Sequence, residues 1–166
     1  DADLAEIFNN LAGKKTLVAF SLPGGNVVEE VVTPVSTGKI SDLLYDRWVR
    51  QRAEDVRRWS DGRLGYVHVA QMSDDSFRPM YADLLGKYNN CDGVVIDIRW
   101  NGGGRMHEDI EVLFTGEKYL TQEIRGKDVC DMPSRRWNKP SIMLVAEPCY
   151  SNAHGTPWVY KHQKIG

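Results

Sequence analysis

The sequence predicts an α/β protein built on a largely parallel sheet. From Arg63 onward, apolar runs suited to buried strands alternate with segments whose apolar residues recur at helical spacing. Such alternation implies βαβ crossovers between neighbouring parallel strands. With 166 residues, 42% of them hydrophobic, the chain can close one core of ordinary domain size and carry a small additional part.

Three elements are expected before this alternation begins. Residues 3–13 (DLAEIFNNLAG) have apolar side chains at helical spacing and a glycine at the end. Residues 16–35 indicate two strands joined by the turn sequence PGGN, as in a hairpin. Ser41 is a suitable N-cap for a helix over residues 42–59, which the following SDG would end.

The part from Arg63 to the end supplies the predicted sheet and its helices. Pro157 suits the first turn of the last helix. The chain begins without methionine and ends just after an expected helix, so we expect a piece of a longer protein. The predicted strands are 64–70 (LGYVHVA), 93–100 (GVVIDIRW) and 141–147 (SIMLVAE), and the predicted helices are 76–88, 105–116 and 153–164.

Composition argues against several classes of function. No apolar stretch approaches the roughly 20 residues that cross a bilayer, and a net charge of -2 gives no general footprint for nucleic acid. The basic residues from Arg47 to Arg58 are interleaved with Glu54 and Asp55, as on a solvated helix face. The three cysteines lie far apart without CxxC spacing, which argues against structural zinc. We therefore expect no metal, organic cofactor, nucleic acid or membrane span.

Three consecutive glycines, Gly102 to Gly104, follow the second predicted strand. In an open α/β sheet, ligands bind where a strand hands over to a helix. Glycine amides there can approach closely and form a nest for an anion, either a bound phosphate or the oxyanion of acyl transfer. The phosphate interpretation is weak, because His107 stands where the third glycine of GxGxxG is required and no GK[ST] follows. A tight turn without a ligand is the remaining alternative.

Ser151 occupies the next handover, after the third predicted strand. A hydroxyl there would stand at the same sheet edge as the glycines, as a nucleophile requires. The amide of Asn152, at the start of a helix, could be one oxyanion donor and a glycine amide the other. The alternative role for Ser151 is an ordinary N-cap. The surrounding sequence is not the GxSxG of α/β hydrolases.

Several motifs in register resemble the tail-specific and tricorn-type serine peptidases, which have a crotonase-like fold. The segments are GYVHV, DGVVIDIRWNGGG and KPSIMLVAEPCYSNAHG. The tricorn type is the closer resemblance, because the glycines occur as WNGGG rather than NPGG. The matched positions are Asp97, Ile98, Arg99, Asn101, Gly103, Gly104, Lys139, Pro140 and Ser151.

The resemblance implies a serine peptidase that hydrolyses peptide bonds through an acyl-enzyme. It assigns Ser151 as nucleophile and the amides of Asn152 and Gly103 as the oxyanion hole, with Gly102 as the alternative donor. Asp97 and Arg99 are expected to be structural, and because an unpaired buried charge is costly we expect each to have a partner. The implied domains are the end of a PDZ-like unit (1–38), a connector helix (39–62) and the first part of the catalytic core (63–166).

Two departures from the family pattern stand out. The tricorn type usually has aspartate after the serine, where this chain has Asn152. The resemblance also places the general base outside these 166 residues. Among local histidines, His107 is the best substitute, ahead of His154 and His68, while His162 is expected on an exposed helix face.

Other interpretations stay open at this point. On the same fold, crotonase-like acyl-CoA enzymes stabilise a thioester enolate with glycine amides and need no serine. A non-catalytic module binding peptide termini or an apolar ligand is the second alternative. The carboxylates Glu108, Asp109 and Glu111 fit a helix start, and the aromatics Trp137, Trp158 and Tyr160 fit a core or interface. The tricorn resemblance favours peptide substrates, a homo-oligomer and a cytoplasmic location, although an exported protein fits the sequence too.

Overall fold

The computed structural model describes residues 3–166 and divides the chain into two compact units, Asp1–Trp48 and Val49–Gly166. The boundary falls inside the long helix α2 (Thr37–Trp59). Each unit is described by itself. Within the described residues, no helix is both long enough and apolar enough to cross a membrane.

The first unit contains a short helix and the predicted hairpin. Strands β1 (Thr16–Ser21) and β2 (Val27–Val32) pair antiparallel, as expected. Helix α1 (Leu4–Ile7) is shorter than predicted and begins with an N-cap bond from Ala5 N–H to Asp3 Oδ1 at 2.8 Å. It stops early because the chain turns at Asn10, whose φ is 59°, a conformation that asparagine tolerates better than most residues.

Helix α2 begins earlier than predicted. Ser36 Oγ accepts the N–H of Lys39 at 3.2 Å, so Ser36 caps the helix. Ser41, the predicted cap, lies inside the helix and donates its hydroxyl to Thr37 O. The predicted end is confirmed: Gly62, with φ of +78°, donates its N–H to Arg57 O at 2.7 Å.

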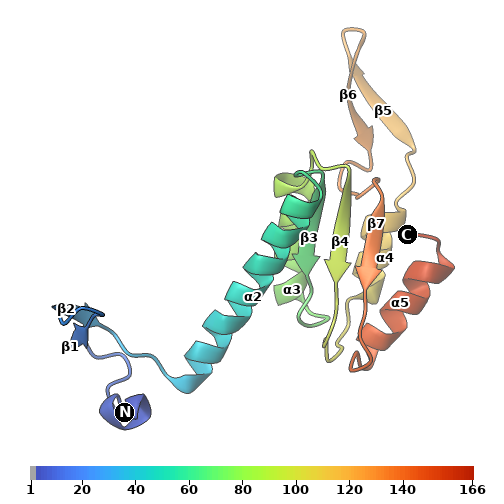
Figure 1. Ribbon diagram of the computed structural model, residues 1–166. Helices are drawn as coiled ribbons and strands as arrows, with labels where there is room; N and C mark the ends of the chain where they lie inside the picture. The colour runs from blue at the N-terminus through green and yellow to red at the C-terminus, as the bar shows by residue number, and fades with distance from the viewer. Residues whose placement is uncertain (1–2) are drawn as a thin grey trace. The chain divides into compact units, whose positions relative to one another are not determined.

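The second unit contains the predicted parallel sheet. Strands β3 (Leu64–His68), β4 (Gly93–Asp97) and β7 (Ser141–Leu144) lie in the order β3-β4-β7, and both pairs are parallel (Figure 1). The central strand β4 is the most buried, in agreement with its continuous apolar run. It ends at Asp97, before the predicted Trp100, because the chain turns there with Asn101 N–H donating to Ile98 O.

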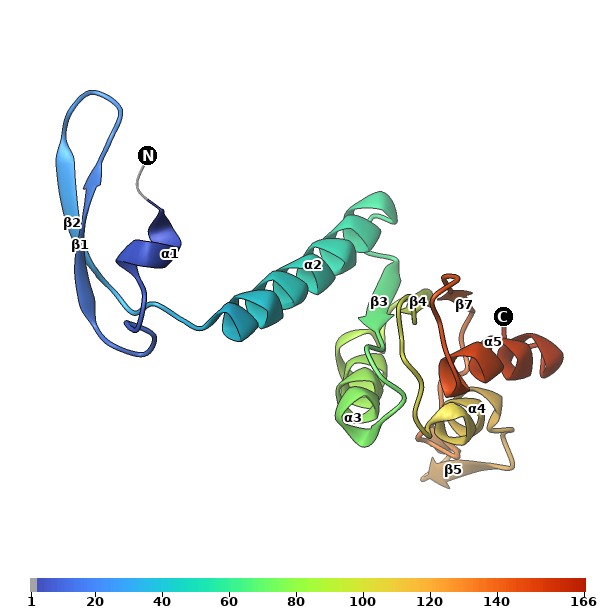
Figure 2. The same ribbon diagram turned by 90° about the horizontal axis from the view of Figure 1, so that it is seen from below.

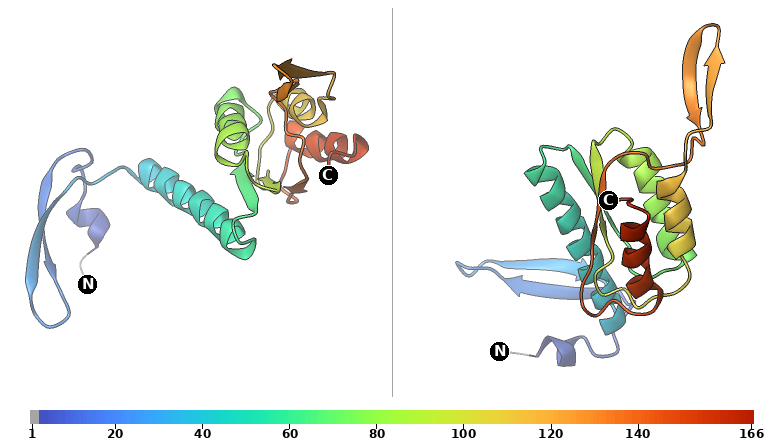
Figure 3. Two further views of the ribbon diagram at one scale, coloured as in Figure 1. Left: turned by 90° about the horizontal axis from the view of Figure 1, so that it is seen from above. Right: turned by 90° about the vertical axis from the view of Figure 1, so that its right-hand side faces the viewer.

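Three helices connect or follow these strands. Helix α3 (Asp74–Ala82) continues into a π-helical turn at Asp83–Lys87, α4 is His107–Thr115 and α5 is Asn152–His162. Helices α3 and α4 cover one face of the sheet and α5 packs against α4 (Figures 2 and 3). Pro157 lies beyond the first turn of α5, so its predicted position is wrong. The buried core includes Val67, Val69, Met80, Leu84, Val94, Ile96, Ile98, Ile110, Leu113, Trp137 and Tyr160.

A second hairpin was not anticipated from the sequence. Strands β5 (Leu120–Ile124) and β6 (Lys127–Met132) pair antiparallel and extend beyond the amino-terminal end of the parallel sheet (Figure 1). Arg125 and Gly126 both have positive φ, at 54° and 75°, which fits the twist of a two-residue hairpin turn. The hairpin lies at the opposite end of the sheet from the loops after β4 and β7.

Candidate active site

The candidate site lies where strands β4 and β7 end. We call residues 98–106, after β4, the glycine loop, and residues 145–151, between β7 and α5, the serine loop. Both follow the arrowheads of their strands in Figure 1. A backbone hydrogen bond joins them, from Tyr150 N–H to Asn101 O at 3.1 Å. The structure thus brings together the two loops that the sequence singles out.

Gly103 lies directly against the serine loop. A Cβ atom on Gly103 would stand 2.7 Å from Ser151 Cβ and 2.8 Å from Tyr150 O, closer than real Cβ contacts allow. Its φ of +99° is also one that residues with side chains rarely adopt. Only glycine at this position allows the two loops to touch.

The backbone of Met72 passes so close to the glycine loop that residue 104 must also be a glycine. Met72, in the loop after β3, donates its N–H to Gly103 O at 3.0 Å and accepts Arg105 N–H at 2.7 Å. A Cβ atom on Gly104 would collide with the Met72 carbonyl. Gly102 is exposed, and a Cβ there would meet the Gln71 side chain only at ordinary contact distance. Two of the three glycines are therefore explained by backbone contacts on both sides of the loop.

Asn101 is fully buried and ties three loops together. Its Nδ2 donates to Val69 O and its Oδ1 accepts Gly103 N–H, both at 2.8 Å. Its carbonyl accepts the Tyr150 N–H of the serine loop. Because a buried amide left without partners costs about 1–3 kcal/mol, Asn101 holds the glycine loop in one position relative to β3 and to Ser151.

This arrangement bears on the predicted oxyanion donors. The Gly103 amide is occupied by Asn101 Oδ1. Across residues 3–166, Gly102 N–H and Asn152 N–H donate to no protein acceptor. Asn152 is the first residue of α5, where helical N–H groups lack intrahelical partners and the helix dipole favours negative charge. The structure therefore leaves one unoccupied donor on the glycine loop and one at the start of α5, directly after the serine loop.

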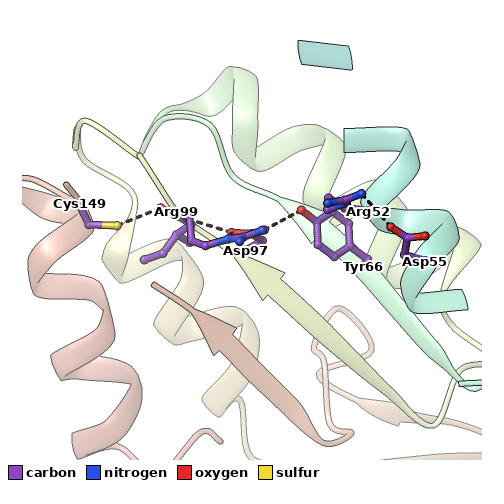
Figure 4. A network of polar contacts seen from close by, with 7 residues as sticks. Arg52, Asp55, Tyr66, Asp97, Arg99 and Cys149 are labelled. Atoms are coloured by element: carbon purple, nitrogen blue, oxygen red, sulfur yellow. Dashed lines mark hydrogen bonds and ion pairs between the residues drawn. The ribbon is translucent and has the colours of Figure 1, made fainter. Parts of the chain in front are cut away.

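The charged residues at the end of β4 are paired, as expected. Asp97 is fully buried and accepts hydrogen bonds from the Arg99 guanidinium, at 2.6 to 3.1 Å, and from the Tyr66 hydroxyl at 2.7 Å. Figure 4 shows these side chains lying in line between Cys149 and helix α2. Burial by itself raises the pKa of Asp97, but the bonds from Arg99 and Tyr66 outweigh burial and hold that pKa below its usual value.

Ser151 is presented in a strained backbone conformation. Its φ is 54° and its ψ is -124°, a region that non-glycine residues occupy only when their surroundings enforce it. Ser151 stands at the N-cap position of α5, yet its side chain makes no capping hydrogen bond, and the residue is exposed. The N-cap interpretation of Ser151 is therefore not supported, and the hydroxyl is free to face a ligand.

The side chain of Asn152 has a role that the sequence did not indicate. Its Oδ1 accepts the backbone N–H groups of Met106 and His107, at 3.2 and 3.1 Å, and so caps helix α4. Its Nδ2 lies 2.6 Å from His107 Nδ1. Ser151, Asn152, His107 and Trp158 line one side pocket of about 570 Å³. The structure thereby places His107 beside the serine loop.

The remaining histidines lie in less specific surroundings. His154 is exposed and lines the same pocket. His68 is half-buried on β3, and burial lowers its pKa. His162 stacks on Trp158 with ring centroids 4.6 Å apart, at the exposed end of α5. Glu108 and Asp109 lie in the first turn of α4, in agreement with their expected place near the helix dipole.

The low pKa of Asp97 predicts an acid-sensitive stability. A carboxyl whose pKa is lower in the folded state stabilises the protein fully above its unfolded pKa, about 3.9, and loses that contribution as pH falls through the folded value. We expect Asp97→Asn to lower the free energy of unfolding by about 2 kcal/mol near neutral pH. This is less than the effect of breaking a fully buried ion pair, because Arg99 is partly exposed. Urea unfolding at a series of pH values from 7 to below 4 should show that the difference in unfolding free energy between wild type and Asp97→Asn shrinks as the pH falls. A difference that stays constant would contradict this prediction.

The strain at Ser151 predicts a stabilising substitution. Glycine adopts the observed φ without steric cost, whereas alanine keeps the strain and removes only the hydroxyl. We expect Ser151→Gly to raise the free energy of unfolding by about 1 kcal/mol relative to Ser151→Ala. Urea unfolding of the two variants side by side measures this, and equal stabilities would show that the backbone there is relaxed.

Comparison with known proteins identifies the family that the sequence motifs resemble. Residues 63–166 match Peptidase family S41. A tricorn protease homolog of Saccharolobus solfataricus is 37% identical over 130 residues, covering 75% of this chain and 12% of the relative. The tricorn protease of Thermoplasma volcanium is 30% identical over 124 residues, covering 74% of the chain and 12% of the relative.

Longer but more distant matches extend over nearly the whole chain. A putative tricorn-like protease C-terminal subunit of Sulfurisphaera tokodaii is 24% identical over 92% of this chain. The crystal structure of the tricorn protease superposes on 99% of the chain with a TM-score of 0.81 and 19% sequence identity, which shows the fold. The chain spans 12% to 19% of the length of these curated relatives. On the family match over residues 63–166, the chain belongs to Peptidase family S41, and its α/β fold is one that the tricorn protease also contains.

Proposed function

We propose that Ser151 is the nucleophile of a serine peptidase that cleaves peptide bonds through an acyl-enzyme. The observation that carries this proposal is the conformation of Ser151: its backbone is strained, its hydroxyl caps nothing, and it stands between the glycine loop and the start of α5. Strain of this kind persists only where surrounding contacts enforce it, and it gathers at functional sites. An acyl-CoA enzyme of the same fold needs no serine nucleophile, so a strained serine at this position favours the peptidase.

The proposed reaction follows from the two loops. Ser151 Oγ attacks the scissile carbonyl carbon and gives its proton to a general base. The carbonyl oxygen becomes an oxyanion, and Asn152 N–H donates to it from the N-terminus of α5. The C–N bond then breaks as the base gives this proton to the leaving amine. Water next attacks the ester carbonyl and gives a proton to the base, which passes it to Ser151 Oγ as the ester C–O bond breaks.

The glycine loop is proposed to supply the second oxyanion donor. Gly103 has the position, because its backbone touches Ser151, but its N–H is held by Asn101. It can serve only by sharing its proton between Asn101 Oδ1 and the oxyanion. Gly102 has the unoccupied N–H on the same loop. Both amides therefore remain assigned to the proposed oxyanion hole beside Asn152.

The rest of the protein is proposed from the family. Residues 1–38 would be the end of a PDZ-like unit, 39–62 a connector and 63–166 the first part of the catalytic core. The general base would come from a segment outside these 166 residues. The substrates would be peptides or unfolded proteins, and the complete protein would act as a homo-oligomer in the cytoplasm, as the tricorn resemblance suggests.

Active-site labelling tests the proposal directly. In the full-length protein, a fluorophosphonate should form a covalent adduct on Ser151, located by peptide mass spectrometry. Ser151→Ala should abolish the adduct and lower kcat/KM for a peptide substrate by more than about a thousandfold. The control is Ser134→Ala, which removes an exposed hydroxyl outside the site and should change neither.

Two outcomes would contradict the proposed function. A folded protein that takes no label at Ser151 is not a serine peptidase of this kind, and binding of an acyl-CoA by the same protein would favour the acyl-CoA alternative. A peptide that binds intact, with equal affinity in wild type and Ser151→Ala and with no turnover, would indicate a binding module.

A further inference from the structure

The orientation of the Asn152 side chain is fixed by the backbone of helix α4. The oxygen and nitrogen of an asparagine amide differ in that the oxygen only accepts and the nitrogen only donates. Backbone N–H groups of Met106 and His107 both point at one end of the Asn152 amide, at 3.2 and 3.1 Å. Because two donors require an acceptor, that end must be Oδ1, and Nδ2 must be the other.

This orientation sets the tautomer of His107. Asn152 Nδ2 lies 2.6 Å from His107 Nδ1, and Nδ2 can only donate. Nδ1 must therefore be the acceptor of this bond and carry no proton. A neutral imidazole has one proton, so it resides on Nε2. His107 is thus held as a hydrogen-bond donor at Nε2.

His107 held in this way cannot serve Ser151 as a general base. A base takes the serine proton on a ring nitrogen that is free to accept, usually Nε2, while Nδ1–H is oriented by an acceptor. In this chain Nε2 already has its proton and Nδ1 is occupied by a donor. The two ring nitrogens have the opposite protonation to those of the histidine in a catalytic triad. His107, the best local candidate for the general base, is therefore excluded from that role.

His107 and Ser151 line the same pocket, so a ligand held at Ser151 lies within reach of the His107 donor. The residues that line this pocket are His107, Ser151, Asn152, His154, Gly155, Trp158 and Val159. The described residues that line it include no carboxylate, so its walls favour an acceptor on the ligand. In a peptide, the backbone carbonyl of a residue next to the scissile bond is such an acceptor.

We infer that His107 is a substrate-binding residue, which donates its Nε2–H to a backbone carbonyl of the peptide beside the scissile bond, and that Asn152 sets the tautomer this requires. The inference rests on the proposed function of Ser151, because it uses a peptide held at that serine. It assigns Asn152 two parts: its backbone N–H faces the oxyanion, and its side chain positions His107.

Asn152→Asp separates this inference from a merely structural role of the side chain. An aspartate can still accept the Met106 and His107 N–H groups, so the cap of α4 stays in place. Its second oxygen is an acceptor, so His107 Nδ1 would become the protonated nitrogen and Nε2 the bare one. The substitution should therefore reverse the tautomer while leaving the fold unchanged.

The tautomer is measured by solid-state NMR of the full-length protein labelled with 15N-histidine at about pH 8, where histidine is ordinarily neutral. The shift of each ring nitrogen reports whether it carries a proton, and the spectrum of His107→Gln identifies the His107 signals. We expect Nε2–H in wild type and Nδ1–H in Asn152→Asp. Nδ1–H in wild type would overturn the inference, whatever the activity of Ser151.

Kinetics test the binding role in the same protein. The loss of one hydrogen bond to the substrate should raise KM for a peptide by about 3- to 10-fold in His107→Phe, with little change in kcat. His107→Gln, which keeps an N–H donor, should recover part of the loss. The control is Tyr119→Phe, which removes a polar group from an exposed ring just before β5, outside the pocket, and should not change KM.

Fluorophosphonate labelling distinguishes this inference from the proposed function. If wild type takes no label at Ser151, the proposed function fails. If wild type is labelled but His107→Phe loses the label and kcat together, then His107 is the base, and the inference is overturned while the proposed function stands. Unchanged KM in His107→Phe, with Ser151 labelled, would also overturn it.

Discussion

The buried side chain of Asn101 is the interaction on which the candidate site depends. Its amide, with no exposure to solvent, connects the end of β3 at Val69 with the glycine loop at Gly103, and the backbone carbonyl of the same residue accepts Tyr150 N–H from the serine loop. Parallel strands place their carboxyl ends at one edge of a sheet but do not fix the loops that follow. Asn101 fixes them, because moving any of the three loops would leave a buried donor or acceptor unpaired.

The glycines and the strained serine follow from this connection. Once Asn101 holds the loops together, the backbone at Gly103 must pass so close to Ser151 that no Cβ atom fits, and Gly104 must pass equally close to the Met72 carbonyl. The same contacts allow Ser151 to keep a φ of 54° that an unsupported loop would relax. Gly103 and Gly104 follow β4 because backbone atoms of neighbouring loops pack closely against both sides of the glycine loop.

The sequence predicts the parallel sheet and the meeting of the two loops well, because both follow from the period of apolar residues and from sheet topology. It predicts less about side chains that act through geometry. Asn101 stands in the motif, but two of its partners, Val69 and Tyr150, lie far from it in sequence. The cap that Asn152 places on α4 has no local signal either. The hairpin of β5 and β6 was missed because its strands are mostly exposed and lack an apolar run. Pro157 was expected in the first turn of its helix, but it lies in the second turn of α5, which begins at Asn152.

The dependence of the site on Asn101 is tested most directly by the rate at which a fluorophosphonate labels Ser151 in Asn101→Ala, with the fold monitored by circular dichroism. Asn138→Ala is the matched control, because Asn138 is exposed and lies outside the site. Asn101→Ala should slow labelling by about a hundredfold, the effect expected when one oxyanion donor is no longer held in position, while the protein stays folded and the control is unaffected. Labelling of folded Asn101→Ala at the wild-type rate would show that the site does not depend on the loops being held together by Asn101.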